Sequence, residues 1–256
     1  MMSNQTRKAE EFKALHLPGK PLVLFNVWDA GSTKAVAAAG AKAIATGSWS
    51  VANANGFADG ERIPLPLAMD ILRRIVGATD LPVTVDLESG YGDTMELVGE
   101  TVLLAIDAGA VGCNLEDSFP ANGTLRDAVD QADRIRCVRR VADATKIRFF
   151  INARTDVFFQ RPLEQHDDAM VVEAITRARA YADAGADGLF APGLSDIALI
   201  ARLAEASPLP LNIMVGEATP PVRALAQQGV ARVSHGPRPY FIAMKALEEA
   251  ARAAGA

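Results

Sequence analysis

The chain has 256 residues, of which 50% are hydrophobic and 22% are charged, and its formal net charge is −5. A sequence pI of about 5.3 excludes a broad basic surface for nucleic acid. No uncharged run approaches the roughly 20 residues that span a bilayer. We therefore expect one cytoplasmic domain, residues 1–256, that binds neither nucleic acid nor membrane.

Short apolar runs typical of β-strands alternate along the chain with segments of helical periodicity. Strands are expected at 22–26, 43–46, 83–88, 111–116, 148–154, 187–191, 209–213 and 231–234. Helices are expected at 30–39, 64–77, 94–108, 127–143, 164–184, 195–206, 219–228 and 239–254. Strict strand–helix alternation, repeated eight times in a chain of this length, predicts a (β/α)8 TIM barrel of the α/β class.

Two connections are expected to be longer than the others. One is the stretch 48–62, rich in glycine, asparagine and serine, which follows the second strand. The other is 118–126, which follows the fourth strand. Both come after the carboxyl end of a strand, where a TIM barrel carries its active site.

Carboxylates end the third and fourth expected strands. Asp86 and Glu88 are two residues apart, so in an extended strand their side chains point to one side, as do those of Asn114 and Glu116. Acids that meet at one rim repel each other unless a cation lies between them. Oxygen ligands without a histidine pair select Mg²⁺ or Mn²⁺. The alternative is that Glu88 and Asp117 are rim charges in solvent or in salt bridges.

Arg154 ends the fifth expected strand, where its guanidinium could bind a substrate carboxylate at two points. The alternative is a structural ion pair between Arg154 and a neighbouring acid. At the end of the second strand, Gly47 in Thr46-Gly47-Ser48 permits a close backbone approach, and the N–H groups there could receive an oxyanion. An ordinary turn is equally compatible with this segment.

Several other chemistries are disfavoured. No lysine falls at an expected strand end, which argues against a Schiff-base aldolase. The three histidines, His16, His166 and His235, have no paired spacing, which argues against a histidine-ligated zinc. Neither a dinucleotide-binding glycine fingerprint nor a P-loop is present. His235 could contribute from the end of the eighth strand, although a lone loop histidine is more often structural.

With these residues in place, the chain resembles the isocitrate lyase/phosphoenolpyruvate mutase superfamily over nearly its whole length. The matching segments are 26–32, 46–48, 56–60, 86–92, 114–117 and 152–156. The resemblance implies a Mg²⁺ ion surrounded by Asp86, Glu88 and Glu116, with Asp59 nearby.

The resemblance also implies a set of residues that hold the carboxylate and oxo group of a 2-oxo acid or its enolate. This set is Thr46, Gly47, Ser48 and Arg154, with Asn212 near the site. It further implies a homodimer or homotetramer in which the last helix, 239–254, exchanges between subunits.

The loop after the fourth strand departs from the family pattern. Isocitrate and methylisocitrate lyases carry Lys-Lys-Cys-Gly-His there, and the cysteine serves as the acid in carbon–carbon cleavage, whereas this chain has 118–124 without a cysteine. The loop looks closer to that of the phosphonopyruvate enzymes, but Ser118 and Ala121 replace both of their lysines. A trianionic phosphonate would therefore lose two compensating cations.

The expected function is a Mg²⁺-dependent carbon–carbon lyase that acts on a small 2-oxo acid through an enolate, with decarboxylation of an oxaloacetate-like substrate ranked first. Asp59 and Arg154 are expected to be catalytic, and Asn122, Thr124 or solvent would deliver the proton. One alternative is phosphonopyruvate hydrolase or phosphoenolpyruvate mutase chemistry at a carbon–phosphorus bond. Another is a 2-oxo acid binding protein without catalysis.

Overall fold

The computed structural model describes residues 3–255, and its centre is an eight-stranded parallel sheet. The strands are β1 (Leu22–Leu24), β2 (Ile44–Ala45), β3 (Val83–Asp86), β4 (Gly112–Glu116), β5 (Phe150–Arg154), β6 (Gly188–Ala191), β7 (Leu211–Met214) and β8 (Arg232–Ser234). Their order is β1-β8-β7-β6-β5-β4-β3-β2, and a parallel bridge between Val27 and Thr46 joins the two ends. The expected (β/α)8 barrel is confirmed.

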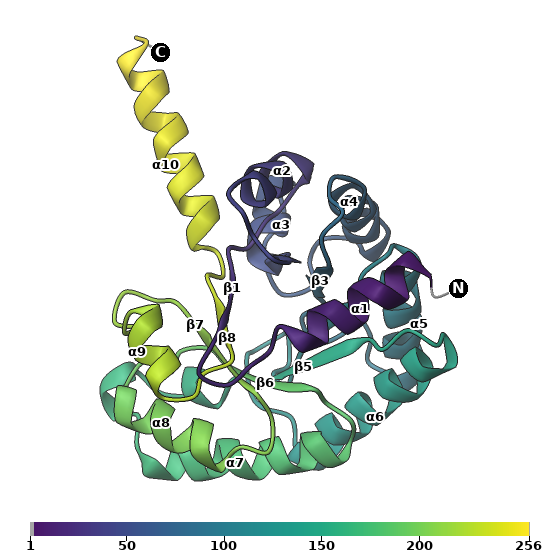
Figure 1. Ribbon diagram of the computed structural model, residues 1–256, viewed down its shortest axis with the longest axis vertical. Coiled ribbons are helices and arrows are strands. Elements are labelled where there is room, and N and C mark those ends of the chain that lie inside the picture. Colours follow the sequence, from purple (N-terminus) through teal and green to yellow (C-terminus); the bar gives the residue numbers. More distant parts are fainter. Residues whose placement is uncertain (1–2, 256) are drawn as a thin grey trace.

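Helices surround the barrel (Figure 1). They are α1 (Asn4–Ala14), α2 (Ala30–Ala38), α3 (Ser48–Ala54), α4 (Leu65–Gly77), α5 (Met95–Asp107), α6 (Ala128–Ala144), α7 (Asp168–Asp183), α8 (Ile197–Ala206), α9 (Val222–Gln227) and α10 (Arg238–Ala253). Two 3-10 turns, η1 (Val157–Phe159) and η2 (Leu163–Gln165), lie between β5 and α7. Within residues 3–255, no helix is both long enough and apolar enough to cross a membrane.

Two helices were not expected from the sequence. The polar helix α1 is capped by the Ser3 side chain, and it buries only Ala9 and Phe12 as apolar residues, so its periodic signal is weak. The seven-residue helix α3 occupies the start of the stretch expected to be one long connection, 48–62. It is rich in serine, asparagine and alanine, a composition that resembles a loop.

Helix α1 packs across the amino-terminal ends of β4 and β5. Phe12 meets the Phe150 ring edge-on at 5.4 Å, and the His16 ring stacks on Phe150 at 4.0 Å. Burial, and then the nearby Arg232, lower the pKa of His16 to about 3, so the imidazole is neutral at physiological pH. His16 therefore acts as a packing residue at this end of the barrel.

Helix α10 extends away from the barrel (Figure 1). It leaves large apolar side chains in solvent, with Phe241 50%, Ile242 52% and Leu247 63% exposed. Exposed apolar residues concentrated on one helix usually mark a contact surface.

Candidate active site

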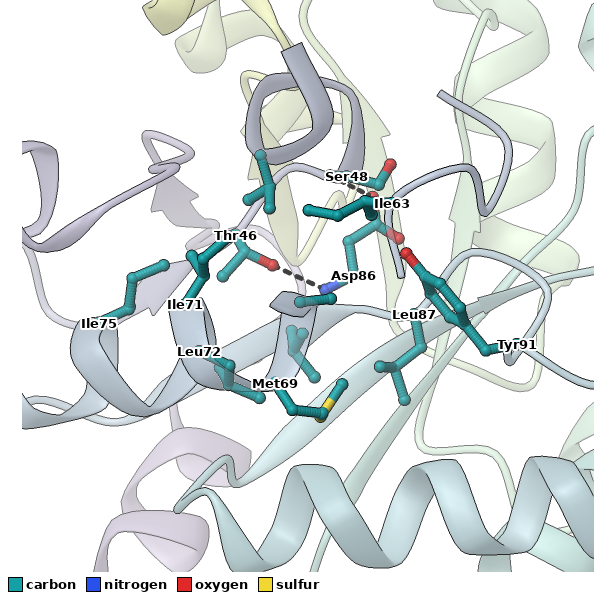
Figure 2. Close-up of a pocket in the computed structure, with 13 residues that line it drawn as sticks. Thr46, Ser48, Ile63, Met69, Ile71, Leu72, Ile75, Asp86, Leu87 and Tyr91 are labelled. Atoms are coloured by element: carbon teal, nitrogen blue, oxygen red, sulfur yellow. Dashed lines mark hydrogen bonds between the residues drawn. The ribbon is translucent and has the colours of Figure 1, made fainter. Parts of the chain in front are cut away.

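Asp86 is the last residue of β3 and stands at the carboxyl end of the barrel. Its backbone N–H donates to the Thr46 hydroxyl at 2.9 Å, and the Ser48 N–H donates to its Oδ2 at 3.3 Å (Figure 2). Its other carboxylate oxygen, Oδ1, is buried and has no hydrogen-bond partner within residues 3–255. A buried carboxylate oxygen without a donor is destabilised, which makes this atom a ready acceptor for a ligand.

Glu88 does not continue the alternation of β3, because the strand ends at Asp86 and Glu88 has a positive φ of 51°. Its Oε2 accepts the Gly60 and Glu61 N–H groups at 2.9 and 2.7 Å, and its Oε1 accepts the Tyr91 hydroxyl at 3.1 Å. The shared orientation of Asp86 and Glu88 expected from strand parity therefore has no basis in β3 itself. Glu88 instead ties the loop that carries residue 59 to the end of this strand.

Glu61, in the loop after α3, binds the loop that follows β3. Its Oε1 accepts the Ser89 hydroxyl at 2.7 Å and the Tyr91 N–H at 2.9 Å. Glu61 and Glu88 both have positive φ and each binds the loop that carries the other. Such a reciprocal pair stabilises two backbone conformations that would otherwise be strained.

Arg154, at the end of β5, forms ion pairs with two acids. Its Nη1 lies 2.9 Å from Glu116 Oε2, and its Nε lies 2.6 Å from Asp156 Oδ1. The Ser118 hydroxyl lies 2.7 Å from Asp156 and 3.1 Å from Glu116, which links both acids to the start of the next loop. The structural ion pair considered for Arg154 is thus present, and the guanidinium also reaches the cavity described below.

Asp117 belongs to a separate ion pair behind the barrel wall. It is fully buried, and it accepts the Tyr181 hydroxyl at 2.7 Å, the Arg177 guanidinium at 3.2 Å and the Asp156 N–H at 2.9 Å. These partners come from α7 and from the residues after β5. The salt-bridge alternative is confirmed for Asp117, which has a structural role.

Glu88, Asp59 and Glu116, at this end of the barrel, are harder to ionise than isolated acids. Burial, and then Asp59 and Asp86, raise the pKa of Glu88 to about 7. Burial and Asp86 also raise the pKa of Asp59. Burial raises the pKa of Glu116, with Arg154 acting in the opposite direction. Desolvation and like charge therefore disfavour the anions here, and a cation among them would relieve both effects.

A cavity of about 180 Å³ opens among these groups. Its polar lining comes from Asn26, Gly47, Ser48, Asp59, Asp86, Asn114, Arg154 and Ser234. Its apolar lining comes from Trp49, Phe159, Phe190, Met214 and Pro237. The cavity therefore offers acids and one guanidinium on the side of β2 to β5, with Phe190 and Met214 on the side of β6 and β7.

Five of the predicted site residues line this cavity: Gly47, Ser48, Asp59, Asp86 and Arg154. The expected backbone oxyanion cradle is not free, because the Thr46 and Gly47 N–H groups donate to barrel carbonyls at 3.1 and 3.2 Å. The Ser48 N–H faces Asp86 instead. The segment therefore behaves as the ordinary βα turn that the sequence left open.

Other predicted residues lie outside the cavity lining. Thr46 borders a narrow cleft of about 20 Å³ behind Asp86, lined mostly by apolar side chains (Figure 2). Asn212 is buried in β7, where its Oδ1 accepts the Ser234 hydroxyl at 3.2 Å. His235 packs on Phe25, with its Nδ1 3.2 Å from a β1 carbonyl.

The two loop residues expected to deliver a proton also lie outside the lining. The Asn122 side chain accepts the Thr124 hydroxyl at 2.8 Å and the Thr124 N–H at 3.1 Å, and both residues are in exposed parts of the loop. The Gln160 side chain holds this loop through the Gly123 carbonyl at 3.0 Å. In this conformation, Asn122 and Thr124 bind each other and do not reach the cavity.

A divalent ion was predicted among Asp86, Glu88 and Glu116. Within residues 3–255, no three acidic, cysteine or histidine side chains converge as a ready-made metal site. Glu116 is paired with Arg154, and Glu88 accepts the Gly60 and Glu61 N–H groups. The residues nevertheless fit a hard cation, because Asp86 keeps an unpartnered oxygen and the surrounding acids are destabilised as anions. The metal site remains a prediction.

The sequence reasoning missed several cavity residues. Asn26, Phe190 and Ser234 lie at or just beyond the carboxyl ends of β1, β6 and β8, so their position in a barrel could have indicated them. Trp49 and Phe159 come from elements that were not predicted, α3 and η1. No local pattern marks these two aromatic residues as part of the site.

Comparison with known proteins identifies the family. The sequence profile described as phosphoenolpyruvate phosphomutase matches residues 12–254. The chain belongs to the isocitrate lyase/phosphoenolpyruvate mutase superfamily. Its resemblance to this superfamily is therefore confirmed.

Three relatives illustrate the range of the superfamily. A Burkholderia cenocepacia J2315 protein, provisionally named a phosphonomutase, has a crystal structure that superposes with a TM-score of 0.95 at 57% identity, covering 98% of this chain and 99% of that one. The 2-methylisocitrate lyase of Escherichia coli K12 is 31% identical, covering 81% of this chain and 73% of the lyase. The oxaloacetate decarboxylase of Pseudomonas paraeruginosa is 32% identical, covering 70% of this chain and 61% of the decarboxylase. Lyases and mutases are thus both found among the relatives.

Proposed function

We propose that this superfamily member is a Mg²⁺-dependent carbon–carbon lyase of small 2-oxo acids, and that decarboxylation of an oxaloacetate-like substrate is its reaction. The observation that carries the proposal is the unpartnered Oδ1 of Asp86, which is buried beside a small cavity that also contains Arg154 and Asp59. Asp86, with Glu88 and Glu116 around it and Asp59 nearby, would hold the ion, and Mn²⁺ could replace Mg²⁺. When bound, the ion would supply positive charge to the oxo group and to the developing enolate oxygen.

The protein residues have separate roles in this proposal. Arg154 would bind the substrate carboxylate next to the oxo group, and the ion pairs with Glu116 and Asp156 hold its guanidinium in place. Ser48, at the start of α3, would contact the same end of the substrate. Thr46 would act indirectly by holding the backbone of Asp86.

The reaction needs one bond to break and one proton to arrive. The bond between C3 and C4 of oxaloacetate breaks, its electron pair becomes the enolate, C4 leaves as carbon dioxide, and C3 later takes a proton. Phe190 and Met214 give the cavity an apolar side, where a departing carboxylate is poorly solvated, and this favours the neutral product. Asp59 lines the cavity, so we assign the proton transfer to it in preference to the distant Asn122 and Thr124.

The proposal is tested by incubating purified protein and Mg²⁺ with oxaloacetate and identifying the products. We expect pyruvate and carbon dioxide in equal amounts, and loss of turnover with EDTA. If oxaloacetate is not consumed and no pyruvate forms, while oxalate binds tightly, the result would favour a non-catalytic 2-oxo acid binding protein. The name of the B. cenocepacia relative favours a second candidate, cleavage of a carbon–phosphorus bond. Phosphate release from phosphonopyruvate would support that candidate.

We also propose that the chain forms a homodimer or homotetramer in which α10 of one copy covers a second copy. An apolar groove of about 770 Å³ lies between the end of α1, β1 and α2. Its lining includes Leu17, Val23 and Phe25, which are 50%, 41% and 39% exposed. The exposed apolar side chains of α10 match this surface in character, and burying both would remove apolar area from water.

Light scattering tests this assembly. Phe241→Glu should reduce the assembly to monomers at concentrations where the unchanged protein is oligomeric, because it places a charge in the buried contact. Val129→Glu is the matched control, since it makes the same kind of substitution at an apolar residue that is 68% exposed and lies on α6, away from α10 and the groove. An unchanged mass for Phe241→Glu would contradict the proposal.

A further inference from the structure

Arg232 lies in the interior of the barrel, and among residues 3–255 it has no direct ion-pair partner. Its residue is 1% exposed, and within residues 3–255 no carboxylate lies within ion-pair distance of its guanidinium. Nη2 donates to Asn114 Oδ1 at 3.2 Å, Nε donates to the Ser234 hydroxyl at 3.3 Å, and Nη1 has no partner. Asn114 and Ser234 both line the 180 Å³ cavity. The guanidinium therefore stands directly behind two residues of the cavity wall.

The hydrogen bonds of Asn114 fix which way its amide group faces. Its Oδ1 accepts from Asn152 Nδ2 at 2.9 Å as well as from Arg232. A guanidinium has donors and no acceptor, so only a carbonyl oxygen can face it favourably. The reversed amide would place its NH₂ group against Arg232 and lose this bond. The orientation is therefore set by chemistry.

The Asn114 NH₂ group is consequently left for the cavity. Within residues 3–255, Nδ2 donates to no acceptor, although Asn114 is only 5% exposed. The positive charge of Arg232 behind the amide oxygen strengthens this arrangement, because it attracts the negative end of the amide dipole. A fixed donor in the wall of a small cavity is suited to an oxygen that carries negative charge.

We propose that Asn114 is a substrate-binding residue that donates from the cavity wall to an oxygen of the bound 2-oxo acid, and that Arg232 is a positioning residue that holds this donor toward the cavity. The inference rests on the proposed function for the nature of the ligand. It adds a donor on β4 and a supporting cation on β8 to the acids and the guanidinium already described.

The decisive variant is Asn114→Asp, which keeps the shape of the side chain and replaces the donor by an acceptor. A carboxylate there can still accept from Asn152 and gives Arg232 an ion-pair partner, so the melting temperature should be equal to or higher than that of the unchanged protein. Oxalate affinity, measured by calorimetry at saturating Mg²⁺, should fall by about 10- to 100-fold, the usual effect of a hydrogen bond to a charged group. Asn4→Asp, which adds the same charge on α1, should bind oxalate normally.

The positioning role of Arg232 is tested by a double-mutant cycle. Arg232→Met should weaken oxalate binding in the otherwise unchanged protein, because the amide is then free to turn, and Arg232→Lys should restore part of the affinity. In an Asn114→Ala background, which has no amide to position, Arg232→Met should cause no further loss of oxalate affinity. A purely structural role for Arg232 would give additive losses instead.

The Asn114→Asp variant and the double-mutant cycle test the two roles separately. Wild-type oxalate affinity in Asn114→Asp would overturn the donor role, and additive losses in the cycle would overturn the positioning role. If the unchanged protein binds no oxalate with Mg²⁺, the proposed function fails. The contact between the Asn114 amide oxygen and Arg232 is then tested only by the melting temperature of Asn114→Asp. In that case a destabilised Asn114→Asp protein would contradict the assigned amide orientation.

Discussion

Replacing Glu88 by glutamine should stabilise the metal-free protein at neutral and alkaline pH. Glutamine keeps one carbonyl oxygen for the Gly60 and Glu61 N–H groups, and its NH₂ group can face the Tyr91 hydroxyl. The substitution removes an anion that burial and the neighbouring acids disfavour. We therefore expect the hydrogen-bonded connection between the two loops to survive while its electrostatic cost disappears.

The magnitude follows from the pKa of Glu88, which is raised from 4.5 to about 7 in the folded chain. At about 1.4 kcal/mol per pH unit, ionising this folded carboxyl group costs about 3 kcal/mol. Because the folded pKa lies above the unfolded one, the stability that Glu88 contributes is complete below pH 4.5 and is lost as the pH rises through 7. The gain from Glu88→Gln should accordingly be small at pH 4.5 and reach about 3 kcal/mol near pH 8.

Urea unfolding in EDTA at several pH values between 4.5 and 8 measures this difference directly. The unchanged protein and Glu88→Gln are compared at each pH, so that the titration of all other groups cancels. A stability difference between the two that does not change with pH would refute the reasoning, since Glu88 would then have an ordinary pKa. A loss of stability in Glu88→Gln at pH 8 would show that the charge itself is needed.

Three further predictions concern other parts of the structure. Asp86→Asn should abolish Mg²⁺-dependent oxalate binding in calorimetry, and retained binding would exclude Asp86 as a ligand. The variant should not lower the unfolding free energy, because it removes an anionic oxygen that is buried without a partner. Tyr181→Phe should lower the unfolding free energy by about 1–3 kcal/mol, since buried Asp117 loses a donor, while kcat/KM for the lyase substrate should not change. Gly112→Ala should cost about 1–3 kcal/mol in urea unfolding, because its Cβ would lie 2.7 Å from the Phe150 carbonyl oxygen; unchanged stability would indicate that β4 and β5 can separate.

The barrel could be predicted from the sequence because its signal is repeated along the chain. Each buried strand is a short apolar run and each covering helix has an apolar face, so the alternation is visible without any long-range information. Helices α1 and α3 carry too few buried apolar residues to show that periodicity. The Ser3 cap stabilises α1, whereas α3 has no side-chain cap and buries Ser50, Val51 and Ala52 against its neighbours.

The candidate site could be predicted only in part. Asp86 and Arg154 end buried strands, where a polar side chain needs a special reason, so their place at the cavity followed from the pattern. The orientation of Glu88 did not, because its backbone turns to positive φ directly after β3. The partners of Arg154 and the position of Arg232 behind Asn114 join strands far apart in the sequence, and no local spacing encodes such contacts.

The central claim is that Asp86 and its neighbours hold a divalent cation on which 2-oxo acid binding depends. Calorimetric titration of oxalate into the purified protein, once with Mg²⁺ and once with EDTA, tests it most directly. We predict saturable binding of one oxalate per chain with Mg²⁺ and none with EDTA. Equal oxalate binding under both conditions, or no binding under either, would contradict the account.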